Sequence, residues 1–125
     1  MIYSKLIDST DVTVPVLAYT STDTGNPVSS GGIGRTNAIT TMILCNTGTP
    51  SLTDETVNSL NVSVYLVKSG DTYGAKNTIV SNLIVPAGET VFFSDEKIIL
   101  DSTDEIYVGT SSADLLAFTI SVLEV

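Results

Sequence analysis

The feature that most constrains the fold is a series of short apolar segments between residues 38 and 125, separated by turn residues. Leu60, Val62 and Val64, for example, alternate with polar residues, and a period of two is typical of a half-buried β-strand. Strand signals that recur about every 8–12 residues predict an all-β fold. We expect a single domain, an antiparallel, jelly-roll-like β-sandwich of about seven to nine strands. The absence of helical periodicity between the segments excludes a parallel α/β fold.

Period-two alternation also assigns the core. A slip of one residue would turn a strand's side chains to the opposite face, so the phase of each strand is the weakest part of this assignment. Two segments, 90–94 and 97–100, are predicted to form either a strand pair or one long bent strand. The residues predicted to be in the core are Ile39, Ile43, Val62, Val64, Leu66, Ile79, Leu83, Val85, Ile106, Val108, Phe118, Ile120 and Val122.

The N-terminal part of the chain has a different pattern. We predict that residues 1–36 form an arm with a long loop and that residues 37–125 form the sandwich. Pro15 interrupts a strand-like segment, and residues 20–35 are rich in Ser, Thr, Gly and Asn. A loop of about 16 residues is long for a compact domain. Two alternatives remain for it: it is ordered by a neighbouring subunit or a particle surface, or it is simply solvated.

The charge balance excludes one class of partner. The chain carries 14 acidic and 5 basic residues, a net charge of −9, and such a field repels nucleic acid. Anionic membrane surfaces are disfavoured for the same reason. No apolar run reaches the roughly 18 residues of a membrane span, and the N-terminus has no signal-peptide pattern. We therefore expect no nucleic-acid or membrane partner and synthesis in a host cytoplasm.

Catalytic chemistry has little support in this sequence. The chain has no His, and its one Cys, Cys45, lies in an apolar stretch and is expected to be buried. A nucleophilic cysteine would lack its usual base. Because acids are plentiful, a pair of facing carboxylates of the glycosidase type remains open, although Trp is absent. We predict no enzymatic activity, no catalytic residue and no cofactor.

Acidic residues gather at 54–55, 95–96 and 101–105. Carboxylates at turns bind Ca²⁺ in some proteins, but none of these groups has EF-hand spacing, and Asp is favoured at turns in any case. The glycine-rich stretch 31–34 fits no phosphate-binding motif and is interpreted as a flexible loop. We therefore predict no metal site.

Four residues are candidates for interaction. Half-buried cross-strand packing is the favoured explanation for Tyr65, Tyr73 and Tyr107, and a small surface patch that binds a partner is the alternative. Arg35 is the only arginine in an acidic chain, and its forked donors suit an intersubunit ion pair with a carboxylate.

Four stretches of the sequence resemble small β-sandwich modules in virion proteins of tailed bacteriophages. They are Ala-Ile-Thr-Thr-Met-Ile-Leu-Cys-Asn-Thr at 38–47, Val-Tyr-Leu-Val-Lys-Ser-Gly at 64–70, Ile-Val-Pro-Ala-Gly-Glu-Thr at 84–90 and Asp-Glu-Ile-Tyr-Val-Gly-Thr-Ser-Ser-Ala at 104–113. Such modules act through surfaces, so the resemblance transfers no functional residue.

The resemblance implies a virion structural protein, with a capsid decoration or cement protein as the leading interpretation. The alternative is a tail, baseplate or fibre component, including a carbohydrate- or calcium-binding module for receptor recognition. The implied partners are the chain itself, as a homo-oligomer for which a trimer is expected, and a major capsid or tail protein. The implied location is the virion.

Overall fold

The computed structural model describes residues 1–21, 37–94 and 97–124. Within them, strands alternate with turns, and the only helical element is a single 3₁₀ turn, η1 (Ala75–Asn77). This confirms the all-β prediction. The strands are β1 (Ile2–Ile7), β2 (Val16–Thr20), β3 (Asn37–Asn46), β4 (Leu60–Val67), β5 (Thr78–Val85), β6 (Thr90–Phe93), β7 (Ile98–Leu100), β8 (Glu105–Thr110) and β9 (Leu116–Glu124).

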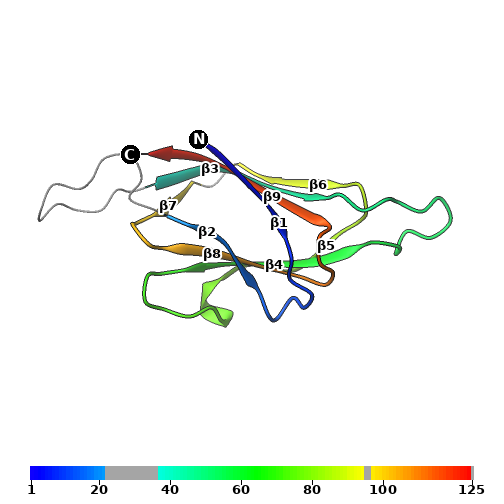
Figure 1. Ribbon diagram of the computed structural model, residues 1–125, viewed down its shortest axis with the longest axis horizontal. Helices are drawn as coiled ribbons and strands as arrows, with labels where there is room; N and C mark the ends of the chain where they lie inside the picture. The colour runs from blue at the N-terminus through cyan, green and yellow to red at the C-terminus, as the bar shows by residue number, and fades with distance from the viewer. Residues whose placement is uncertain (22–36, 95–96, 125) are drawn as a thin grey trace, which may run out of the picture.

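The strands form two antiparallel sheets that lie one above the other (Figure 1). Sheet A has the order β1-β9-β3-β6, with β7 also paired to β3, and sheet B has the order β2-β8-β4-β5. Most connections cross from one sheet to the other, and β4–β5 is a hairpin within sheet B. This alternation is that of a jelly roll, so the predicted sandwich class is confirmed.

Strands β6 and β7 lie along the same edge of β3. Phe93 pairs with Met42, and Ile98 pairs with Ile39 further along β3. The strand pair expected as one arrangement of residues 90–100 is not present in the described residues: β6 and β7 are two separate short strands along one edge of β3 and do not pair with each other.

The core lies between the two sheets. Most of the predicted core residues are in it, and Leu66 and Leu83 pack against it while remaining partly exposed. Several buried residues were not among the predicted core, including Ile7, Tyr19, Met42 and Leu44. The buried apolar cluster comprises Ile7, Ala18, Tyr19, Ile39, Met42, Leu44, Leu60, Val62, Val64, Val85, Leu100, Ile106, Val108, Leu116, Phe118, Ile120 and Val122.

Two core predictions were wrong, and β-bulges explain both. The register of β3 against β9 shifts between Ile39 and Thr41, so Met42 points into the core and Ile43 points outward. In β5, register shifts against β4 lie on both sides of the Val64–Val80 pair, so Val80 rather than Ile79 packs against the core, and Ile79 is 44% exposed. A bulge adds one residue to a strand and reverses the alternation beyond it.

The N-terminal residues contribute to both sheets. Strand β1 pairs with β9 and β2 pairs with β8, and Ile7, Ala18 and Tyr19 are buried in the core. The segment expected to form an arm therefore supplies two strands of the sandwich. Residues 22–36, which include Arg35 and most of the predicted long loop, lie outside the described residues. In the ranges that the structure does describe, no helix is long and apolar enough to span a membrane.

Candidate interaction surface

The outward side of sheet A, here called face A, is uncharged wherever the structure describes its side chains. The strand register aligns these side chains in rows across the sheet: Ser4, Thr119, Ile43 and Phe92, for instance, lie side by side on four neighbouring strands. Face A comprises Ile2, Ser4 and Leu6 of β1, Ala117, Thr119, Ser121 and Leu123 of β9, Ala38, Thr41, Ile43 and Cys45 of β3, Thr90 and Phe92 of β6, and Ile99 of β7.

The most exposed large apolar side chains of face A lie towards its margins, and Ile43 of β3 lies nearer the middle. The exposed fractions are 75% for Ile2, 64% for Phe92, 57% for Ile99, 56% for Leu123 and 49% for Leu6. Small residues of β9 and β3, chiefly Ala, Ser and Thr, occupy the middle. The result is a continuous surface of apolar and hydroxyl groups on one side of a strongly acidic protein.

The predicted burial of Cys45 is only partly confirmed. Cys45 lies on face A, between Ala117 and Thr90 in the strand register, and is partly exposed. Because the bulge in β3 reverses the alternation, Cys45 points away from the core together with Ile43.

The outward side of sheet B, here called face B, is covered in part by the chain itself. Residues 8–15 connect β1 to β2 and pass over β8 at Gly109. A Cβ atom on Gly109 would lie 2.5 Å from the carbonyl oxygen of Val12, so only glycine permits this approach. The hydroxyl of Tyr65 donates a hydrogen bond of 3.1 Å to the same carbonyl.

Ser9 holds the start of the covering segment. Its side chain is 3% exposed, and its hydroxyl lies 3.0 Å from the carbonyl oxygens of Asp11 and Val14. The same hydroxyl accepts a hydrogen bond of 3.1 Å from the backbone N–H of Thr110, and the Thr110 hydroxyl donates to the Ser9 carbonyl at 2.8 Å. These bonds satisfy buried polar groups in the segment and in β8, as buried polar groups require.

The structure brings the three predicted tyrosines together on face B. Tyr65 and Tyr107 are opposite each other on β4 and β8, and Tyr73 reaches them from the β4–β5 connection. The ring centroids are 5.9 Å apart for Tyr65–Tyr73 and 5.5 Å apart for Tyr73–Tyr107, within the range of aromatic pairs. Burial raises the pKa of Tyr107, and the neighbouring Glu105 carboxylate raises that pKa further.

The cluster has both a packing role and a free surface. Tyr65 uses its hydroxyl to anchor residues 8–15, whereas Tyr73 is 40% exposed. That the three rings also form an interaction site stays a prediction, as does the role assigned to Arg35.

In two of the acidic groups, an aspartate caps a turn. The Asp104 carboxylate accepts hydrogen bonds of 2.9 Å from the backbone N–H groups of Ser69 and Asp101. Asp54 accepts from the hydroxyl and the backbone N–H of Thr56, which lowers the pKa of Asp54. Within residues 1–21, 37–94 and 97–124, no group of three or more His, Cys, Asp or Glu residues is placed to hold a metal ion. Residues 95–96 lie outside those ranges.

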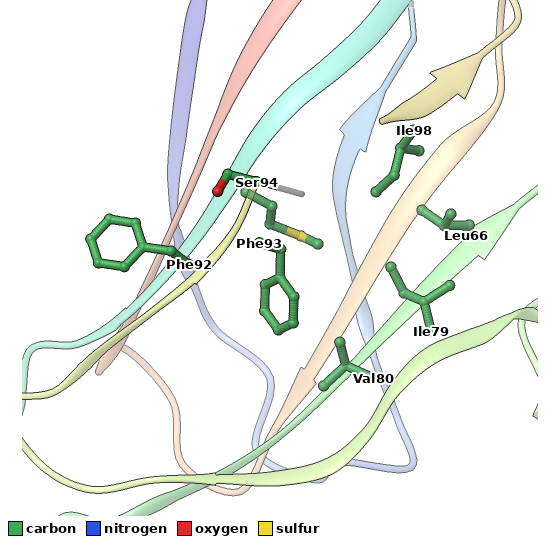
Figure 2. Close-up of a pocket in the computed structure, with 8 residues that line it drawn as sticks. Leu66, Ile79, Val80, Phe92, Phe93, Ser94 and Ile98 are labelled. Carbon is green, nitrogen blue, oxygen red and sulfur yellow. The ribbon is translucent and has the colours of Figure 1, made fainter. Parts of the chain in front are cut away.

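An apolar groove opens where the edges of the two sheets face each other, between β5 and the β6–β7 edge (Figure 2). Its volume is ≈ 450 Å³. Phe93, Leu66, Ile79, Val80 and Ile98 project around this space, whereas the Phe92 ring points away from it. No sequence pattern indicates this groove, because it depends on which strands lie at the sheet edges.

Comparisons with known proteins identify no family. No protein-family model matches the chain, and no curated protein matches it. Among solved structures, the chain is similar to one from the crystal structure of the T13 IBDV viral particle, with 9% sequence identity and a TM-score of 0.44. The match covers 99% of this chain but only 30% of the viral chain.

Proposed function

We propose that the protein is a non-enzymatic structural component of a bacteriophage virion, a decoration or cement protein that binds and stabilises the capsid surface. The observation that carries this proposal is face A, an entire sheet surface without a described charge in a chain of net charge −9. Protein interfaces are depleted of charged residues at their centre, because desolvating a charge opposes association.

The fold and the sequence resemblance support the same function. Jelly rolls are used by viral capsid domains and by lectins, although a fold alone does not assign a role. The four stretches that resemble phage virion modules fall on β3, on the end of β4, on the β5–β6 turn and on β8. They are therefore parts of the sandwich scaffold, and the proposal assigns function to the surfaces that this scaffold displays.

Quantitative mass spectrometry of purified particles tests the proposal. A decoration protein is expected in numbers comparable to those of the major capsid protein, and its removal is expected to lower the temperature at which particles release their DNA. Only a few copies per particle would instead indicate the tail or baseplate alternative. If the protein is absent from purified particles, the virion proposal is wrong.

A second candidate, a sugar-binding receptor-recognition module, is favoured by the tyrosine cluster. Tyr73 is exposed beside two further rings, and sugars commonly bind on aromatic surfaces. Because the chain contains no Trp, its intrinsic fluorescence comes from tyrosine, and titration with host-surface glycans would report binding directly. Saturable quenching that disappears in Tyr73→Ala but persists in Tyr73→Phe is expected for a binding platform. An unchanged signal in the unmodified protein would remove this candidate.

A further inference from the structure

We infer that face A is a self-association surface whose occupant is a second copy of this chain, packed sheet A against sheet A around a two-fold axis. This inference goes beyond the proposed function and is tested on the purified protein in solution; on a particle, the capsid surface and the second copy would compete for the same face. It rests on the distribution of charge, on the geometry of the strands and on the size of the face.

The distribution of charge restricts how two copies can meet. The strands contain only Lys5, Glu105 and Glu124 as charged residues, so the other charges lie in the connections. Lys5 is directed to sheet B, where its Nζ donates a hydrogen bond of 2.8 Å to the Leu17 carbonyl, Glu105 belongs to sheet B, and Glu124 is the last residue of β9 in sheet A. Two copies that approach through their acidic connections repel each other over a Debye length of about 8 Å. Contact through face A brings together no charged side chain that the structure describes on that face.

The geometry suits a symmetric contact. In a two-fold interface, the same patch serves both partners, so a surface without charge is complementary to itself. Sheets pack face to face about 10 Å apart, with interdigitating side chains, as the two sheets of this protein already do through their inward faces. The rim residues Ile2, Phe92, Ile99 and Leu123 would then lose their contact with water.

The size of face A determines how tightly two copies are expected to associate. Four strands about 4.8 Å apart and about eight residues long, at about 3.3 Å per residue, give a footprint of about 500 Å². Two copies then bury about 1,000 Å², which is below the roughly 1,200–2,000 Å² of stable specific interfaces and close to the minimum expected of a biological interface. We therefore expect a weak dimer, with a dissociation constant on the order of micromolar, rather than an obligate one.

Sedimentation equilibrium over about 1 to 200 µM protein tests the inference, a range chosen to bracket a micromolar constant. The wild-type protein is expected to shift from monomer to dimer as its concentration rises. Phe92→Lys should weaken association at least tenfold, because it buries an ammonium group in face A. The matched control is Ile84→Lys: Ile84 is also 64% exposed and on an edge strand, but it lies on sheet B, so the dimer should persist.

A second measurement requires no substitution. Cys45 lies on face A, so the rate at which its thiol reacts with a maleimide should fall as the protein concentration rises. Circular dichroism and thermal melts establish that both lysine variants fold.

Three results would overturn the inference. One is a wild-type protein that stays monomeric at the highest concentration. Another is equal weakening by Phe92→Lys and Ile84→Lys. The third is a monomer whose Phe92→Lys variant loses only particle binding, which would assign face A to a different protein.

Discussion

The outward faces of the two sheets differ in what covers them. Face B is crossed by residues 8–15 of the same chain, which Gly109 admits and Ser9 and Tyr65 hold in place. Face A carries no such segment among the described residues and exposes Ile2, Phe92 and Leu123. Both sheets are built from strands of the same alternating kind, so the difference comes from where one connection runs. A jelly roll has two outward sheet faces, and this chain covers part of one of them with its own residues 8–15.

The largest loss of stability is expected from a substitution in β3, and it tests which residues of β3 point to face A. Met42→Asp should cost about 4 kcal/mol of unfolding free energy or more, because Met42 is 1% exposed and an unpaired buried charge is strongly unfavourable. Ile43→Asp, one residue along, should cost about 1 kcal/mol or less, because its side chain points outward. Urea denaturation of both variants checks this. Equal losses would show that β3 has no bulge.

The next prediction tests how face B is covered. Gly109→Ala should destabilise the protein by about 2–3 kcal/mol, because the added Cβ would collide with the Val12 carbonyl. Gly74→Ala is the control, since a Cβ there has nothing within 4 Å and the backbone is extended. Chemical denaturation measures both, and limited proteolysis should cleave residues 8–15 faster only in Gly109→Ala. A stable Gly109→Ala variant would contradict the close crossing.

Substitutions of two serines compare the hydrogen bonds of the segment that covers face B with those on face A. Ser9→Ala should cost about 1–2 kcal/mol, because the buried Thr110 N–H loses its acceptor. Ser4→Ala on face A should cost less than about 0.5 kcal/mol, because the Ser4–Thr119 hydroxyl contact of 3.0 Å is exposed to water. Thermal unfolding of the two variants tests the difference, and indistinguishable values would remove Ser9 as an anchor.

The smallest expected effect is a dependence on alkaline pH. The pKa of Tyr107 is raised in the folded protein, first by burial and then by Glu105, so its neutral form is favoured by folding. This contribution to stability is fully present below the unfolded-state value of about 10 and is lost as the pH rises through the folded-state pKa. Denaturation between about pH 8 and 11 should show falling stability, and Tyr107→Phe should reduce the slope. Part of the slope should remain, since burial also raises the pKa of Tyr19.

Much of the fold could be predicted from local patterns. The alternation in β4 and β8 fixed both their extents and their buried sides, and turn residues marked most boundaries. The phases of β3 and β5 could not be predicted in full, because a bulge depends on the register with a neighbouring strand rather than on the residues of the strand itself.

The candidate surfaces were predicted only in part. The structure brings the three tyrosines together, with Tyr65 and Tyr107 paired across β4 and β8, while their role in binding a partner stays a prediction. Only 15% of the residues are charged, which suits a surface packed against neighbours but does not indicate which surface, because face A is assembled from five strands of widely separated sequence. The meeting of Val12 with Gly109 likewise joins residues far apart along the chain.

The central position of β9 in sheet A bears on how this chain folds. Strand β9 pairs with both β1 and β3, so neither of these strands finds that neighbour until residues 116–124 have left the ribosome. Such distant pairing gives a high contact order, and folding on a scale of about milliseconds to seconds is expected. During synthesis, the edges of β1 and β3 that pair with β9 therefore remain unpaired. The yield of soluble protein should depend on how quickly β9 is synthesised and pairs with them.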